Sequence, residues 1–277
     1  MPASFDIATI ATQLGNEARR FDIDVVAECD STNTLLQSRA ERGAPSGSVL
    51  IAQAQTSGRG RRGRVWISAP GDSLTFSLFW RFAPRTSPAG LSLAVGLAVA
   101  RAIEKVGVTE GNPLFGTGET ALETTLRPPV QLKWPNDILI DGRKLGGILI
   151  ELLPGAPHAA VIGIGINRRL PPDLPDEIRA TAAALPVATE SDLLLAALLH
   201  ELLHTLGQFA TSGFAGLRAE WLTYHAFQNH PIRLLSDFAP ACDGICRGVD
   251  VDGALLFEFD GRIERVLSGE VSLRSAT

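Results

Sequence analysis

The sequence has little of what marks a secreted or membrane protein. Its three cysteines are too few for a disulfide framework, which indicates a reducing compartment. No apolar run reaches the roughly 18 residues of a membrane span, and the longest, Leu91 to Ala100, is too short. The N-terminus lacks the basic and then apolar pattern of a signal peptide. We therefore expect a cytoplasmic location and no membrane partner.

The chain also lacks an excess of basic residues. Its 277 residues carry a formal net charge of -5, with 45% hydrophobic and 20% charged residues, a profile typical of an ordinary globular protein. This length can form one large domain, or a large and a small one. The acidic balance argues against nucleic acid as the main partner, so we expect no nucleic-acid partner.

The positive charge that is present is concentrated between Gly58 and Trp66. Four arginines lie within seven residues of this stretch: Arg59, Arg61, Arg62 and Arg64. Neighbouring guanidinium groups repel one another, but their forked donors match phosphate or carboxylate oxygens. The aromatic Trp66 can cover a flat group. We predict a loop that wraps a phosphate-bearing small molecule, and the alternative is a solvated basic surface loop.

The glycines of this loop also fit the dinucleotide-binding pattern G-x-G-x-x-G, at Gly58, Gly60 and Gly63. Glycine allows positive φ and a close approach of the backbone to a ligand. The dinucleotide pattern requires a strand before it and a helix after it. Residues 48–52 predict the strand, but Val65 to Ser68 predict another strand followed by a turn. We therefore reject a dinucleotide-binding fold.

Two lysines flank a predicted hairpin whose turn is Asp141-Gly142. Lys133 precedes the first strand and Lys144 opens the returning strand. The pair Gly146-Gly147 interrupts that strand, which predicts a bulge or a close approach to a ligand. Lys133 and Lys144 are thus candidate anion ligands, although exposed hairpin lysines are common.

Two further segments carry candidate binding residues. In the predicted strand 159–167, Gly163 and Gly165 lie on one face, which can abut a flat ligand or simply pack in the sheet. Asn167 ends this strand, and its amide can contact a base edge. Ser31 and Thr32 stand before a predicted helix that ends near residue 41, where they can serve as N-caps.

A second motif, His200-Glu201-Leu202-Leu203-His204, fits H-E-x-x-H. Histidines at i and i+4 lie on one helix face, and zinc metalloproteases use this spacing with the glutamate as general base. A catalytic zinc also needs a third protein ligand, and no extension of the motif supplies one. We expect no zinc and a polar stripe on a packed helix, with a zinc hydrolase as the unfavoured alternative.

The remaining periodicity predicts a protein with both helices and strands. Residues 1–20 predict one short helix and no separate N-terminal domain, whereas 88–106 and 190–210 predict long apolar helices. Residues 108–129 lack periodicity and predict an inserted loop. From Pro231 onward, short strands alternate with Asp-Gly turns, which predicts a small β-barrel.

Taken together, six ordered motifs resemble those of biotin protein ligases, also called biotin–[acetyl-CoA-carboxylase] ligases. The motifs are residues 30–33, 55–66, 133–137, 142–151, 163–167 and 268–274. The resemblance implies an α+β fold in which a mixed sheet flanked by helices, like that of class II aminoacyl-tRNA synthetases, precedes an SH3-like barrel. It implies a biotin- and ATP-binding catalytic domain at 1–229 and a C-terminal SH3-like domain at 230–277. We expect the ligase-only form without a DNA-binding domain.

The resemblance implies that biotin and ATP form biotinyl-5′-AMP, which then biotinylates a lysine of the biotin carboxyl carrier protein of acetyl-CoA carboxylase. Mg²⁺ would accompany the phosphates, with Asp137 as the candidate protein ligand. The family also allows a homodimer. Lipoate-protein ligases share the fold and the adenylate chemistry, but the arginine loop and the C-terminal motif favour biotin.

The resemblance also assigns roles to individual residues. Catalysis is assigned to Lys144, Arg59 and Arg61. Biotin binding is assigned to Ser31, Thr32, Asn33, Gln55, Gly58, Arg59, Gly60, Arg61, Lys144 and Gly147. Binding of ATP and the adenylate is assigned to Arg61, Arg62, Arg64, Trp66, Lys133, Asn136, Lys144 and Asn167.

Overall fold

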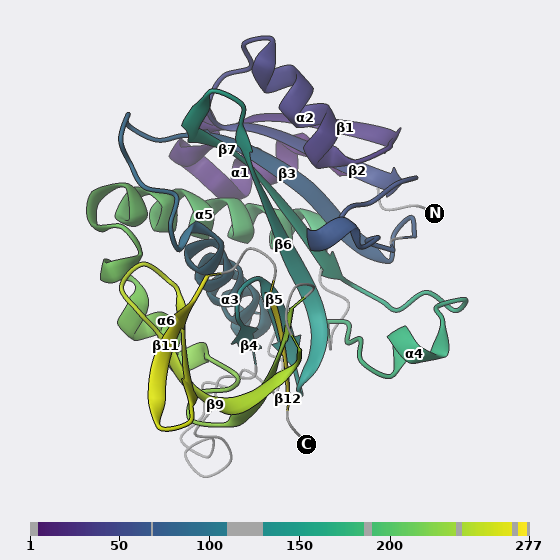
Figure 1. The fold of residues 1–277 in the computed structure, drawn as a ribbon. Helices are drawn as coiled ribbons and strands as arrows, with labels where there is room; N and C mark the ends of the chain where they lie inside the picture. Colours follow the sequence, from purple (N-terminus) through teal and green to yellow (C-terminus); the bar gives the residue numbers. More distant parts are fainter. Residues whose placement is uncertain are drawn as a thin grey trace.

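The computed structural model describes residues 5–67, 69–109, 130–185, 190–236, 240–267 and 271–275. These residues form two sheets and several helices (Figure 1). The predicted insertion lies almost wholly outside the described residues. The larger sheet has seven strands, in the spatial order β1 (Asp22–Cys29), β2 (Ser48–Gln55), β3 (Ser73–Arg81), β7 (Ala156–Asn167), β6 (Arg143–Leu153), β5 (Asp137–Ile140) and β4 (Val130–Lys133).

This sheet is mixed, because β1 and β2 are parallel and its other neighbouring strands are antiparallel. Helices cover both of its faces (Figure 1). The helices are α1 (Ile7–Leu14), α2 (Thr32–Glu41), α3 (Leu91–Thr109), α4 (Asp176–Arg179), α5 (Ser191–Ser212) and α6 (Arg218–Tyr224). The short 3₁₀ helices among the described residues are η1 (Gly15–Arg20), η2 (Arg61–Gly63) and η5 (Phe214–Gly216).

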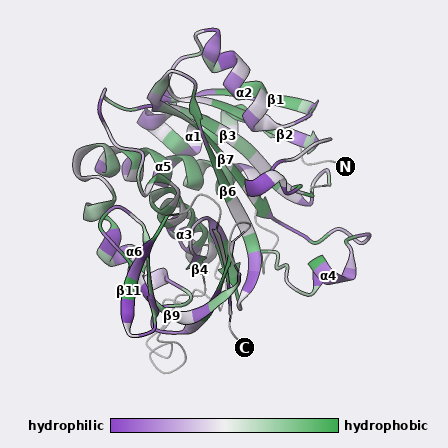
Figure 2. Ribbon diagram, viewed as in Figure 1, coloured by the Kyte–Doolittle hydropathy of each residue, from purple (hydrophilic) through white to green (hydrophobic). Residues whose placement is uncertain are grey.

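The alternation of side chains along the strands separates a core face from a polar face. In β3, Leu74, Phe76 and Leu78 are buried in the main core with residues of α3 and α5. The intervening Thr75 and Ser77 point to the opposite face, because successive side chains of a strand alternate. Hydrophobic residues accordingly concentrate in the central strands and in α3 and α5 (Figure 2). The polar face is the one available for a binding site.

Helix α5 is long and apolar enough, by length and composition alone, to span a membrane. Half of its most apolar window is buried inside the fold, where it packs against α3 and α1. Leu198, Leu202 and Leu206 are fully buried there. This burial is typical of the core helix of a globular protein.

The C-terminal strands form the second sheet. In spatial order they are β11 (Arg262–Val266), β10 (Leu255–Phe259), β9 (Cys242–Val249), β8 (Pro231–Ser236) and β12 (Val271–Ser275), all antiparallel. The predicted series of short C-terminal strands is confirmed, but the edge strands β11 and β12 do not pair with each other among the described residues. The strands therefore form an open sheet rather than a closed barrel. The main core continues from the helices into this sheet.

Candidate active site

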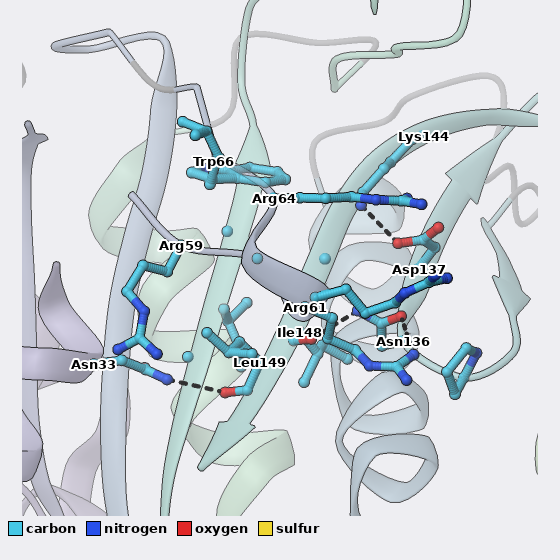
Figure 3. Close-up of a pocket in the computed structure, with 18 of the residues that line it drawn as sticks. Asn33, Arg59, Arg61, Arg64, Trp66, Asn136, Asp137, Lys144, Ile148 and Leu149 are labelled. Atoms are coloured by element: carbon cyan, nitrogen blue, oxygen red, sulfur yellow. Dashed lines mark hydrogen bonds and ion pairs between the residues drawn. The ribbon is translucent and has the colours of Figure 1, made fainter. Parts of the chain in front are cut away.

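A cleft opens on the polar face of the seven-stranded sheet. The N-terminus of α2, the arginine-rich loop, the β5–β6 hairpin and strand β12 line it (Figure 3 shows part of this lining). It gathers fifteen of the predicted site residues, namely Ser31, Thr32, Asn33, Gln55, Arg59, Gly60, Arg61, Arg62, Arg64, Trp66, Lys133, Asn136, Asp137, Lys144 and Gly147. Residues from separate motifs thus line one cavity.

At one end of the cleft, polar side chains at the start of α2 are buried instead of capping the helix. Ser31 occupies the N-cap position, but its side chain makes no capping hydrogen bond. The Ser77 hydroxyl lies 2.8 Å from Thr32 Oγ1 and 2.6 Å from Asn33 Oδ1. The backbone N–H of Thr32 donates to Gln55 Oε1 at 2.8 Å. This network holds a buried polar wall with fixed geometry, as recognition of a small polar group requires.

Glu151 on β6 fixes two of these groups, a role that the sequence did not reveal. Its Oε2 accepts a hydrogen bond from Asn33 Nδ2 at 2.9 Å, and its Oε1 pairs with Arg59 at 2.6 Å. Asn33 Nδ2 also donates to the Leu149 carbonyl at 3.2 Å (Figure 3). Arg59 is therefore anchored to the sheet beside the polar wall.

The arginine-rich loop folds back on itself over the cleft. Gly60 N donates to Arg64 O at 2.7 Å, and Trp66 N donates to Gly58 O at 2.9 Å. Positive φ occurs at Gly63 and at Arg62, with φ of 67° and 57°. A non-glycine residue in the left-handed region is uncommon and costs free energy. The sharp turn that Arg62 and Gly63 make is thus part of how the loop presents its arginines.

The strand expected in this segment is absent, and one of its glycines lies outside the cleft lining. The strand predicted from Val65 onward does not form, since Val65 makes only an isolated bridge with Arg59 in the described part of the segment. Gly58 does not line the cleft. Instead, a Cβ at Gly58 would lie 2.5 Å from the Trp66 carbonyl oxygen, so glycine is required there to close the loop.

The bare face predicted at Gly163 and Gly165 receives protein side chains. A Cβ at Gly165 would lie 2.6 Å from the Trp66 ring, and one at Gly163 would lie 2.3 Å from Asn33 Oδ1. Trp66 therefore lies against the β7 backbone and becomes a wall of the cleft (Figure 3). Its Nε1 is buried without a hydrogen-bond partner in the described structure. A buried donor without a partner is costly.

At the other end, a partly buried carboxylate lies between two lysines. Asp137 Oδ1 is 2.6 Å from Lys144 Nζ, and its Oδ2 is 3.6 Å from Lys133 Nζ. Burial alone would raise the pKa of Asp137, but the two lysines outweigh it and hold that pKa below its ordinary value. Burial lowers the pKa of Lys133. The Lys144 side chain remains 40% exposed towards the cleft, where it can contact an anion.

Arg61 and Asn136 connect the loop to the hairpin. Arg61 Nη1 donates to Asn136 Oδ1 at 3.3 Å, and Asn136 Nδ2 donates to the Ile148 carbonyl at 2.9 Å. Burial lowers the pKa of the Arg61 guanidinium from its ordinary value. The predicted bulge is also present, because Ile138 pairs with Gly146 while Leu139 pairs with Lys144, which leaves Leu145 extra.

The lining contains seven basic side chains and a single acidic one among the described residues. Arg274 on β12 supplies one of these charges, and sequence reasoning gave it no role. Such an excess of positive charge favours a polyphosphate. The single carboxylate, Asp137, is already paired with two lysines and does not make a site for a resident metal ion.

Asn167 does not line the main cleft. Its Nδ2 donates to the Ala183 carbonyl at 2.9 Å. It lies in an adjoining pocket that shares Val65, Trp66 and Lys144 with the cleft and is otherwise lined mainly by apolar residues. This pocket lies beside the aromatic wall, as a site for a flat base requires.

The H-E-x-x-H motif lies on α5, outside the cleft. Glu201 pairs with Lys105 of α3 at 3.7 Å, whereas both histidines contact Glu17 of η1. The glutamate of the motif is thus not in the position of a general base beside the histidines. Glu17 is a third side chain that offers a metal-ligand atom beside the two histidines. The sequence analysis did not identify it.

Comparison with known proteins agrees with this geometry. The model of the "Biotin/lipoate A/B protein ligase family" matches residues 25–167. The bifunctional ligase/repressor BirA of Escherichia coli is 36% identical over 260 residues, covering 92% of this chain and 74% of that protein. The biotin–[acetyl-CoA-carboxylase] ligase of Mycobacterium tuberculosis is 34% identical over 258 residues, covering 90% and 88%.

A solved structure gives the same picture. The biotin protein ligase from Aquifex aeolicus in complex with biotin and ATP matches with a TM-score of 0.74 and 27% identity, covering 92% of this chain and 99% of that one. The expected mixed sheet flanked by helices is confirmed. The chain belongs to the biotin/lipoate A/B protein ligase family, among its biotin protein ligases.

Proposed function

We propose that the protein joins biotin to ATP to give biotinyl-5′-AMP and then transfers biotin to a lysine of a biotin carboxyl carrier domain. The observation that carries this proposal is that a buried polar wall and seven basic side chains line the same cleft. The polar wall suits a small polar head group, and the basic end suits a triphosphate. A zinc hydrolase is not supported, because Glu201 pairs with Lys105.

In the first step, a biotin carboxylate oxygen bonds to the α-phosphorus of ATP, the bond to the bridging oxygen breaks, and pyrophosphate leaves. Negative charge gathers on the phosphoryl oxygens, and preorganised cations stabilise it. Lys144 is our choice for the contact with the α-phosphate, since its amine faces the cleft while Asp137 holds it. Arg59 and Arg61 lie between the polar wall and this lysine, where they can hold the carboxylate against the phosphate.

In the second step, the carrier lysine amine attacks the acyl carbon of the mixed anhydride and AMP leaves. The chain must therefore exclude water from the adenylate until the carrier docks. The arginine-rich loop lies over the cleft between the two ends of the site. Ser31, Thr32, Asn33 and Gln55 would bind the biotin head, and Trp66 with Asn167 would frame the adenine.

The remaining partners follow from this chemistry. Arg62, Arg64 and Lys133 would meet the pyrophosphate, and Mg²⁺ would arrive on the ATP phosphates. The relative in Mycobacterium tuberculosis is named for acetyl-CoA carboxylase, so the carrier of that enzyme is the proposed macromolecular substrate. We propose that this takes place in the cytoplasm without nucleic acid.

The direct experiment incubates the protein with biotin, Mg²⁺-ATP and an apo biotin carboxyl carrier domain, and measures the carrier by intact mass spectrometry. A gain of one biotinyl group that requires ATP supports the proposal. A parallel reaction, in which lipoate takes the place of biotin, is the control. The proposal would be overturned if the carrier were modified by lipoate in preference to biotin. It would also be overturned if biotin were not transferred while lipoate was adenylated.

A further inference from the structure

A cluster of three side chains on the helical side of the fold is not used by the proposed ligase reaction. Glu17 of η1 lies between His200 and His204, which are one turn apart on α5. Glu17 Oε2 is 2.7 Å from His200 Nδ1, and Glu17 Oε1 is 2.9 Å from His204 Nε2. The ligand atoms of all three residues lie within 4.8 Å of one another.

We propose that Glu17, His200 and His204 bind a divalent transition-metal ion, with Zn²⁺ as the best match. Two imidazoles and one carboxylate are ligands that zinc accepts, and three protein ligands leave a fourth position for water. The donors of this set suit Zn²⁺ better than Mg²⁺ or Ca²⁺, which prefer oxygen ligands. Among the described residues, this is the one group of three such side chains with its ligand atoms this close.

The geometry needs only a small adjustment to receive the ion. At metal–ligand distances of about 2.1 Å, two ligands of a tetrahedral ion lie about 3.4 Å apart. The contacts of 2.7 and 2.9 Å are hydrogen bonds, so each pair must separate by about 0.5 to 0.7 Å as the metal replaces a proton. The His204 side chain is 54% exposed, and a rotation of exposed side chains provides this space.

The two imidazole rings lie close together on one side of α5, with centroids 4.5 Å apart. A metal binds the unprotonated nitrogen of an imidazole. The i and i+4 spacing on a helix that is half buried in the fold fixes two of the three ligands in advance.

This site would bind metal without the hydrolytic chemistry associated with its sequence motif. Glu201 turns to Lys105 on the neighbouring helix and leaves no motif carboxylate beside the ion. The third ligand instead joins η1 to α5, which lie 183 residues apart at this contact. Because η1 leads directly into β1, metal binding would fasten the edge strand of the main sheet to the core helix.

The test uses full-length protein dialysed against chelator, without nucleotide or biotin. Titration calorimetry with Zn²⁺ should show one ion per chain. In His204→Ala and Glu17→Gln, we expect the dissociation constant to rise by at least about tenfold. Glu201→Gln is the matched control in the same motif, and its affinity should stay within about twofold of the wild type. Melting curves recorded without metal check that each variant is folded. Added Zn²⁺ should raise the melting temperature of the wild type but not that of His204→Ala.

Absorption of the Co²⁺-loaded protein identifies the ligands independently. We expect the d–d bands of a nitrogen and oxygen site, without a sulfur-to-cobalt charge-transfer band. A charge-transfer band would assign the ion to Cys29, Cys242 or Cys246 and overturn the proposal. Absence of Zn²⁺ binding to the wild type, equal affinity in His204→Ala, or an equal loss in Glu201→Gln would also overturn it.

Discussion

Lys144 and Asp137 face each other across the β5–β6 hairpin, with 2.6 Å between the lysine Nζ and the carboxylate Oδ1. The whole chain contains only three lysines, Lys105, Lys133 and Lys144, and two of them contact this one carboxylate. A lysine ammonium is a compact point charge, unlike the broad fork of an arginine. The two lysines therefore place compact positive charges where the arginines of the loop converge.

The first prediction concerns this lysine. Lys144→Ala should lower the rate of biotin-dependent pyrophosphate release from ATP by about 10²- to 10³-fold, since one preorganised cation at a reacting oxyanion contributes that much. This rate is measured by quenching the reaction at timed intervals, at saturating biotin, and assaying the released pyrophosphate. Lys105→Ala, which removes the one lysine outside the cleft, should leave the rate unchanged. A loss below about threefold in Lys144→Ala would refute the role that we assign to it.

The second prediction tests the wall made by Trp66. In Gly165→Ala, the new Cβ would lie 2.6 Å from the indole ring, so the ring must move away from β7. We expect the KM for ATP to rise at least about tenfold, which corresponds to roughly 1.4 kcal/mol of binding. Gly207→Ala in α5 is the control, because its Cβ meets nothing within 4 Å. It should raise the free energy of unfolding by up to about 1 kcal/mol and leave the KM for ATP as it was.

The third prediction concerns the contribution of the C-terminal sheet. Arg274 on β12 lines the cleft and lies close enough to Lys133 and Asp137 to affect the pKa of each. Arg274→Ala should weaken ATP binding by about 10- to 100-fold if this guanidinium makes one charge-assisted hydrogen bond to a phosphate. Arg262→Ala, in the same sheet but outside the cleft lining, should bind ATP like the wild type in calorimetry. Equal ATP affinity in both variants would show that the sheet does not take part in nucleotide binding.

The sequence predicted most strands because their alternation is a local property. Apolar and polar residues alternate from Leu74 to Leu78, between a core of helices and a polar face, and a period of two is visible without a structure. The fold class and the common cleft followed from the ordered motifs. The detailed shape of the arginine-rich loop did not follow, because no local residue pattern signals the left-handed backbone at Arg62.

The groups that the sequence missed act through partners that are distant in the chain. Glu151 contacts Arg59 across 92 residues, and Glu17 contacts His200 across 183. Neither glutamate has a local pattern that sets it apart from a solvated surface residue. The strand order β2-β3-β7-β6 and the packing of α1 on α5 bring these carboxylates to their partners. The roles of such residues therefore depend on topology, which short motifs do not encode.

The fourth prediction concerns the junction between the two sheets. His225 is buried there, its ring 4.7 Å from that of Trp221 and its Nε2 4.0 Å from Cys246 Sγ. Burial lowers the pKa of His225 to about 4, whereas an exposed histidine in the unfolded chain titrates near about 6.5. Between these two values the unfolded chain binds a proton that the folded chain does not. The free energy of unfolding must therefore fall as the pH drops through this interval.

For this one group, the loss between about pH 7.5 and about pH 5 amounts to roughly 2 kcal/mol. His225→Phe keeps an aromatic ring beside Trp221 and removes the titration. Urea unfolding at the two pH values should show a pH-dependent loss smaller by that amount in the variant, whatever its absolute stability. His158→Gln, away from this junction, serves as the control and should lose as much stability as the wild type. If the loss in His225→Phe equals that of the wild type, His225 is already protonated in the folded protein at pH 5, and the acid sensitivity of the fold arises elsewhere.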